Sequence, residues 1–246
     1  MSLRLTSQMV KWQEFTLDTV QAALFTPEPN AFVPGKAVGT ILGHFQDRFN
    51  GEMQVLPLPA EFPHEFPRVQ LKSSDDRWHL SMGPTRADAI WRFSATASNE
   101  SLRDVAAACA EMPKRYVEAL GIPVSRLSLV IHRFCRVVDP ANLLIERFCN
   151  DESRREPFNR SSTFEIHNHK VYVPQHGDID YPINSWVRCK SALTVADHAP
   201  AIAIEQDLNT VADEQTERRF GLSCITKYFE MAAAEADQII RKYFPD

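Results

Sequence analysis

The chain has 246 residues, of which 44% are apolar and 24% are charged, and its formal net charge is −5. This composition is typical of a globular protein with a sizeable core, and no apolar run approaches the roughly 18–20 residues that span a bilayer. The acidic balance lacks the basic face that binding to a phosphate backbone requires, so we expect no nucleic-acid partner and no membrane partner.

The cysteine pattern predicts a reducing compartment. The five cysteines are odd in number and widely spaced, and no CxxC pair occurs. A disulfide framework or a zinc knuckle would need such pairs. The first residues, MSLRLTSQMVKW, also lack the apolar core of a signal peptide. We therefore expect a cytoplasmic protein.

The first half of the chain predicts a strand, a helix, a hairpin and a second helix. Residues 10–25 alternate as a strand does, and apolar residues then repeat at three and four positions from Pro34 to Phe49. Prolines make residues 56–67 an extended connection, and residues 68–94 have hairpin turns. A long helix should begin near Ser98 or Ser101, where Asp104 follows as in a capping box, and end at Gly121.

The second half predicts the same plan: a strand, a short helix, a charged loop, three strands and a long closing helix. We expect these elements at 125–138, from Asp139 to Phe148, and at 150–161, 162–173, 183–195, 200–208 and 218–244.

These elements define an α+β fold with antiparallel sheet and long helices on one face. Residues 1–121 would form an N-terminal half and residues 122–246 a C-terminal half, and together they would make one compact unit. Because both halves follow the order strand, helix, strands, helix, an internal duplication is one hypothesis. The other is that two unrelated stretches alternate similarly.

Several segments together resemble a known family. RLSLVIHRFCRV at 126–137, AIAIEQDLNT at 201–210 and the closing helix from FGLSCITKYFEMA at 220 are similar to a sporadically distributed bacterial family of uncharacterised proteins of about 250 residues. WHLSMGPTRADAIWRF at 78–93 fits the hairpin of that family. The resemblance implies a bacterial, cytosolic, whole-chain α+β unit and no assigned reaction.

The densest set of metal-type side chains lies in FEIHNHKVYVPQHGDID, residues 164–180. Side chains alternate on a strand, so Glu165, His167 and His169 would share one face while Phe164 and Ile166 face the core. Three such ligands could hold zinc or another divalent ion. Side chains that could complete the shell are His176, Asp178 and Asp180.

The same pattern has a structural interpretation. An antiparallel strand with one wet face often has histidine and glutamate on that face, and HGD is good turn chemistry. Glu205 and Asp207 share a strand face in the same way, and paired carboxylates could serve acid–base chemistry or simply be solvated.

No catalytic motif stands out elsewhere. The chain has no GxGxxG, GxxxxGK[ST], GxSxG or HExxH sequence. We therefore favour a non-catalytic interaction or regulatory protein that binds a protein partner or associates with itself, for example as a homodimer. We expect no cofactor. The alternatives are a metal-dependent hydrolase that uses Glu165, His167 and His169, and a small-ligand sensor with a pocket between the two halves.

Overall fold

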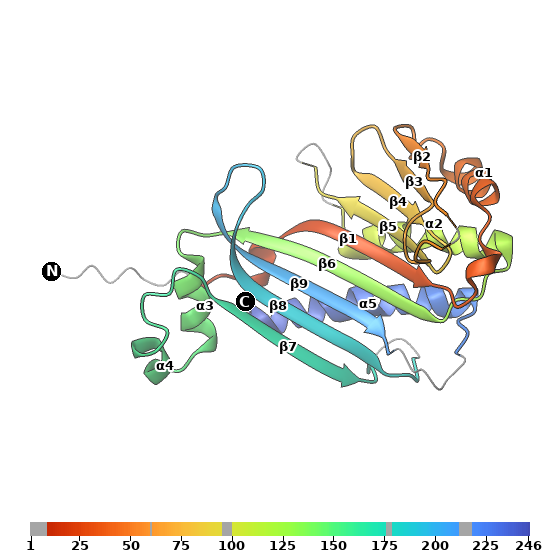
Figure 1. The fold of residues 1–246 in the computed structure, drawn as a ribbon. Helices are drawn as coiled ribbons and strands as arrows, with labels where there is room; N and C mark the ends of the chain where they lie inside the picture. Colours follow the sequence, from red (N-terminus) through yellow and green to blue (C-terminus); the bar gives the residue numbers. More distant parts are fainter. Residues whose placement is uncertain (1–8, 60, 95–99, 176–178, 212–217) are drawn as a thin grey trace.

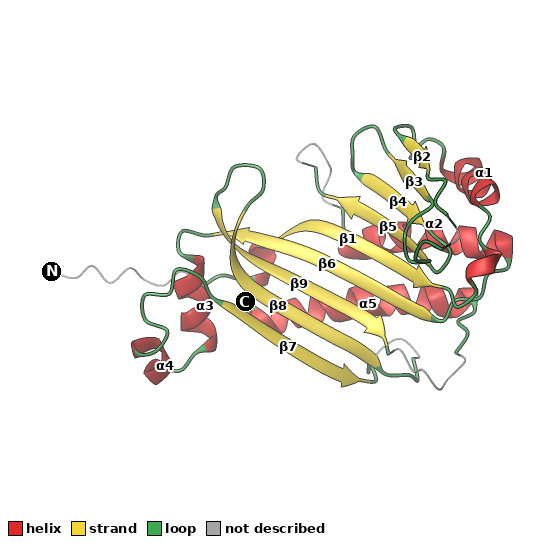
Figure 2. Cartoon of the chain, viewed as in Figure 1, coloured by secondary structure: helices red, strands yellow, loops and turns green. Residues whose placement is uncertain are grey.

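A computed structural model describes residues 9–59, 61–94, 100–175, 179–211 and 218–246. Nine antiparallel strands form one continuous sheet in the order β2-β3-β4-β5-β1-β6-β9-β8-β7 (Figures 1 and 2). The expected α+β class with antiparallel sheet is confirmed. We expected an antiparallel sheet in each half, and instead the two sets of strands join edge to edge.

The strands range from three to eleven residues in length. They are β1 Thr16–Phe25, β2 Met53–Val55, β3 Val69–Lys72, β4 Trp78–Met82, β5 Arg86–Arg92, β6 Arg126–Arg136, β7 Glu165–Tyr172, β8 Ile183–Leu193 and β9 Pro200–Thr210. The helices are α1 Pro34–Phe45, α2 Leu102–Leu120, α3 Pro140–Phe148, α4 Asp151–Arg155 and α5 Leu222–Tyr243, and single 3-10 turns lie at Trp12–Glu14 and Pro29–Ala31.

The junction between the two halves of the chain is the pair β1–β6. Ala22 of β1 lies opposite Leu129 of β6, and both side chains are fully buried. On one side of this pair β5, β4, β3 and β2 follow outward, and on the other side β9, β8 and β7 follow. The sheet therefore ends in β2 at one edge and in β7 at the other.

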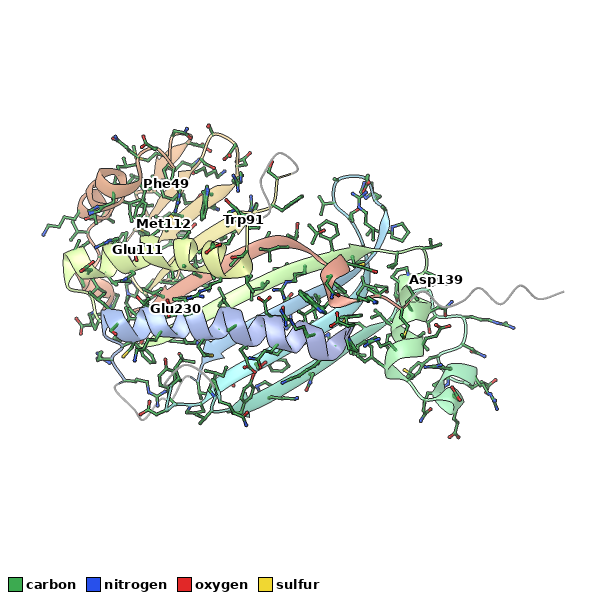
Figure 3. The ribbon with its side chains drawn as sticks, turned by 180° about the vertical axis from the view of Figure 1, so that it is seen from behind. Phe49, Trp91, Glu111, Met112, Asp139 and Glu230 are labelled. Carbon is green, nitrogen blue, oxygen red and sulfur yellow. The ribbon has the colours of Figure 1, made fainter. Side chains whose placement is uncertain are left out.

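The core lies between the sheet and the long helices. In β6, Leu127, Leu129 and Ile131 are fully buried, while Val130 and His132 are only half-buried. This period of two assigns alternate residues to a helix-covered face and an open face. Figure 3, seen from behind, shows α2 and α5 side by side across the covered face.

Polar groups in the core fix α5 to the sheet. Arg133 of β6 is buried, and its guanidinium donates to Gln206 of β9 at 2.5 Å and to Asp237 of α5 at 2.6 Å. Gln206 in turn donates to the carbonyl of Ala236 at 2.8 Å, and the Tyr228 hydroxyl donates to the carbonyl of Leu208 at 2.6 Å. Because buried polar groups are costly without partners, these bonds restrict how α5 sits on the strands.

The expected start and stop signals of the second helix are confirmed. The Ser101 hydroxyl accepts from the backbone N–H of Asp104 at 3.2 Å, so α2 begins at Leu102. Gly121 has a φ of 63°, a left-handed conformation that glycine adopts without steric cost, and it ends the helix.

Two expectations about local structure were wrong. Residues 10–25 are not one strand: Trp12–Glu14 form a 3-10 turn before β1 begins at Thr16. The charged segment 150–161 is not all loop, because Asn150 caps the backbone N–H of Ser153 at 2.8 Å and starts α4. In the part of the chain that the structure describes, none of the helices combines the length and the apolar character needed to cross a membrane.

Candidate functional site

The predicted orientation of β7 is confirmed. The side chains of Glu165, His167 and His169 are exposed, while Phe164 and Ile166 pack against the core. The three polar residues therefore share the open face of the sheet. Glu205 and Asp207 of β9 lie on this open face as well, where Glu205 accepts from Arg188 at 3.1 Å.

The three polar residues of β7 have different partners. The His167 Nε2 atom lies 2.6 Å from Oε1 of Glu165. The His169 ring stacks on the Trp186 ring with 4.0 Å between centroids, and its Nε2 lies 3.3 Å from Oδ1 of Asn184. The imidazole of His169 is therefore held by β8, away from the Glu165–His167 contact.

No three His, Cys, Asp or Glu side chains come together as metal ligands within the residues that the structure describes. His176 and Asp178, which could complete a shell, lie outside those residues, and Asp180 is exposed. A divalent metal on Glu165, His167 and His169 stays a prediction.

The outer edge of β7 pairs with no strand among the residues that the structure describes. Ser191 N–H donates to the Phe164 carbonyl at 2.9 Å, so Phe164 and Ser191 form a hydrogen-bonded pair. Hydrogen-bonded pairs alternate along an antiparallel ladder, and the register of β7 and β8 continues through Glu165 opposite Lys190. The N–H and C=O groups of Glu165, His167, His169 and Val171 therefore point away from β8, toward the outer edge.

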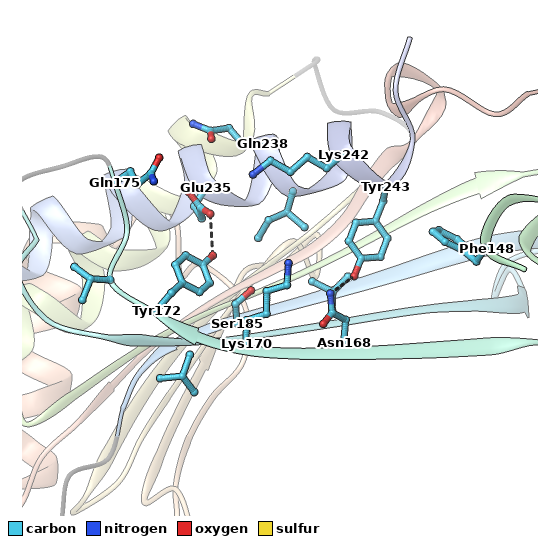
Figure 4. A pocket seen from close by; sticks show the side chains of 14 residues that line it. Phe148, Asn168, Lys170, Tyr172, Gln175, Ser185, Glu235, Gln238, Lys242 and Tyr243 are labelled. Carbon is cyan, nitrogen blue, oxygen red and sulfur yellow. Dashed lines mark hydrogen bonds between the residues drawn. The ribbon is translucent and has the colours of Figure 1, made fainter.

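A cleft of about 740 Å³ lies on the covered side of the same strand, between β7, β8 and α5 (Figure 4). It lies within the C-terminal half, and its walls include Phe148, Val187 and Ile239. Val187 and Ile239 are buried among core residues. The apolar walls give the cleft a surface that favours the apolar part of a ligand.

Two hydrogen bonds cross from β7 to α5 at this cleft. The Tyr172 hydroxyl donates to Oε1 of the buried Glu235 carboxylate at 2.8 Å, and the Asn168 amide donates to the Tyr243 hydroxyl at 2.9 Å. Burial, followed by the hydrogen bond to Glu235, raises the pKa of Tyr172, and burial also raises the pKa of Tyr243. Both hydroxyls therefore keep their protons at neutral pH.

Sequence reasoning missed this cleft. Its side chains come from segments more than 60 residues apart, such as Tyr172 and Glu235. One signal was available: Glu235 falls in the apolar stripe of the closing helix, between Ala232 and Ala236. A carboxylate on the core side of a helix indicates a polar partner across the interface.

Comparisons with known proteins do not assign the chain to a family. No family model matches the chain, and no curated protein matches it. The di-domain ARO/CYC StfQ from the steffimycin biosynthetic pathway aligns over 92% of this chain and 97% of that chain, at 8% identity and a TM-score of 0.21. This score is too low to support an argument about fold or function. The resemblance to an uncharacterised bacterial family stays a prediction.

Proposed function

We propose that this protein is a non-catalytic interaction protein that self-associates by pairing the outer edges of two β7 strands. The observation that supports this proposal is the row of outward backbone groups from Glu165 to Val171. An unpaired strand edge of this kind is a template for another strand. Residues 169–171 are all exposed, including Val171 at 55%, so the edge is accessible.

The sequence of β7 fits a second copy of itself. In an antiparallel pair centred on His167, a two-fold axis places Glu165 of each copy opposite His169 of the other. A carboxylate then faces an imidazole twice, and such cross-strand pairs stabilise a sheet by roughly 0.2–1 kcal/mol each. The two open faces become continuous, so the aromatic pair His169–Trp186 of each copy stays on one surface.

Replacing His167 with proline tests the proposal. Because the N–H of His167 points away from β8, proline there removes no bond of the monomer's own sheet. It does remove an intermolecular bond in each copy, so we expect association to weaken by at least about tenfold. Sedimentation equilibrium of the full chain measures the dimer fraction, and thermal unfolding reports whether the monomer remains folded.

Two control variants separate the edge from other effects. His167→Ala keeps the backbone N–H, so it should leave the dimer largely intact. Val55→Pro makes the same change at the opposite edge. Lys72 N–H donates to the Glu52 carbonyl and Leu56 N–H to the Arg68 carbonyl, so Val55 also points its backbone outward. A monomeric wild-type protein, or equal dimer loss in Val55→Pro, would contradict the proposal.

The metal-dependent hydrolase remains a second candidate because Glu165 and His167 are in contact on an accessible face. Elemental analysis of the purified protein separates the two functions. A stoichiometric divalent metal that is lost in His167→Ala would favour the hydrolase, and a metal-free folded protein would remove it.

We also propose that the two halves, 1–121 and 122–246, are a duplicated unit. Three features support this. The first strand of each half, β1 or β6, lies at the centre of the sheet, and the last strand of each half, β5 or β9, pairs with it. A long helix, α2 or α5, then closes each half. The cytoplasmic location and a different protein partner stay predictions of the sequence.

A further inference from the structure

We infer that the cleft between β7 and α5 binds a small organic anion with an apolar body. This site differs from the outer edge of β7, because Asn168, Lys170 and Tyr172 line it from the covered side of the strand and Val171 alone is shared with the edge. Lys170 rises from β7 toward α5, and Lys242 extends along α5 over the same space (Figure 4).

The two lysines supply the charge that an anion needs. Neither side chain forms a hydrogen bond or an ion pair with another side chain among the residues described. The acidic residue of the cleft, Glu235, is engaged by the Tyr172 hydroxyl instead. The cleft has two ammonium groups and one carboxylate, which is already hydrogen-bonded. Its side chains therefore have an excess of positive charge, although the net charge of the protein is −5.

The apolar side chains that line the cleft favour an anion whose remaining atoms are apolar. Phe148, Val187 and Ile239 line the cleft, and the accessible apolar area comes mainly from Val171 and Val173, which are 55% and 49% exposed. A fully hydrated ion such as inorganic phosphate would gain nothing from this surface. A ring or short chain that bears a carboxylate or sulfonate would bury apolar area and keep its charge beside the lysines.

The volume agrees with such a ligand. Pockets that hold small organic molecules typically measure about 300–1,000 Å³, and the cleft measures about 740 Å³. Gln238 and the Tyr243 hydroxyl add polar groups at its rim. These groups can orient a ligand through hydrogen bonds.

Fluorescent probes that differ only in charge test the inference. The anion 8-anilinonaphthalene-1-sulfonate and the neutral N-phenyl-1-naphthylamine have the same ring system, and only the first bears a sulfonate. We expect the wild-type protein to bind the sulfonate at one site per chain. The double variant Lys170→Met/Lys242→Met should weaken that binding about tenfold and leave the affinity for the neutral probe unchanged.

A matched control removes the same total charge elsewhere. Lys36 of α1 and Lys190 of β8 are exposed and lie outside the cleft. Lys36→Met/Lys190→Met should keep the wild-type affinity for the sulfonate. Equal weakening in this control, or equal affinity of the wild-type protein for both probes, would overturn the inference. Because only the cleft is probed, monomeric His167→Pro should still bind, which separates this result from the test of self-association.

Discussion

The two edge strands of the sheet differ in how readily another strand could pair with them. β2 has three residues, and the proline-rich segment 56–67 follows it directly. Short strands and prolines prevent a sheet edge from pairing with another chain. β7 has eight residues and contains no proline. The β2 edge is therefore protected, and within the described part of the chain the β7 edge is unpaired along its length.

The helices at the two ends of the sheet also differ in how they contact the strands. At the β2 end, α1 packs against α2 and β3, and its Ala37 and Ile41 are fully buried. Beside it, the Arg48 guanidinium lies 4.2 Å from the centre of the Trp78 ring. Under β7, α5 is connected by two polar bonds around a cleft. The comparison teaches that the β2 end has a protected edge and a closed core at Ala37 and Ile41, although a hollow of about 670 Å³ lies beside Arg48 and Trp78. The β7 end has an unpaired edge and a cleft against its helix.

The largest expected effect contrasts two identical truncations. Ile41→Ala should lower the free energy of unfolding by about 3–5 kcal/mol, because it removes buried methylenes and leaves a closed cavity. Ile239→Ala should cost only about 2 kcal/mol, the transfer term alone, because Ile239 already borders open space. Urea denaturation measures both values. Equal losses would show that the two ends are packed alike.

A smaller effect is expected where β7 meets α5. Tyr172→Phe removes the hydroxyl that donates to Glu235 and leaves a buried carboxylate without this partner. The loss should be about 1–3 kcal/mol in the free energy of unfolding at neutral pH. Tyr172→Phe combined with Glu235→Leu removes both groups, so it should cost less than the sum of the two single changes. Simple additivity would mean that the bond does not tie β7 to α5.

The smallest expected effect is a change in how the stability of the fold depends on pH, and it concerns the same tyrosine. Burial raises the pKa of Tyr172 above its ordinary value, and burial raises that of Tyr181 to about 12. The folded chain then keeps these protons while the unfolded chain loses them above about pH 10. The free energy of unfolding should therefore fall as the pH rises above about 10. Tyr172→Phe should make the fall less steep, and an unchanged slope would contradict the role of burial.

Local patterns predicted most of the elements. The alternation at 125–138 predicted β6, which runs from Arg126 to Arg136, and the Ser101 and Gly121 signals predicted the ends of α2, because these features depend on neighbours in the chain. The exposed face of Glu165, His167 and His169 followed from the same period of two. The 3-10 turn at Trp12 was missed because its indole bonds to Asp246, at the other end of the chain.

The sequence by itself determined the α+β class, the order of the elements apart from β2 and α4, and which face of most strands is apolar, since these depend on spacings of two to four residues. Only the tertiary structure decided that β1 pairs with β6, that β7 is left at an edge, and that Lys170 and Lys242 meet over one cleft. Such pairings depend on which of several similar apolar strands pack together. That choice is made by the whole core, which no single segment contains.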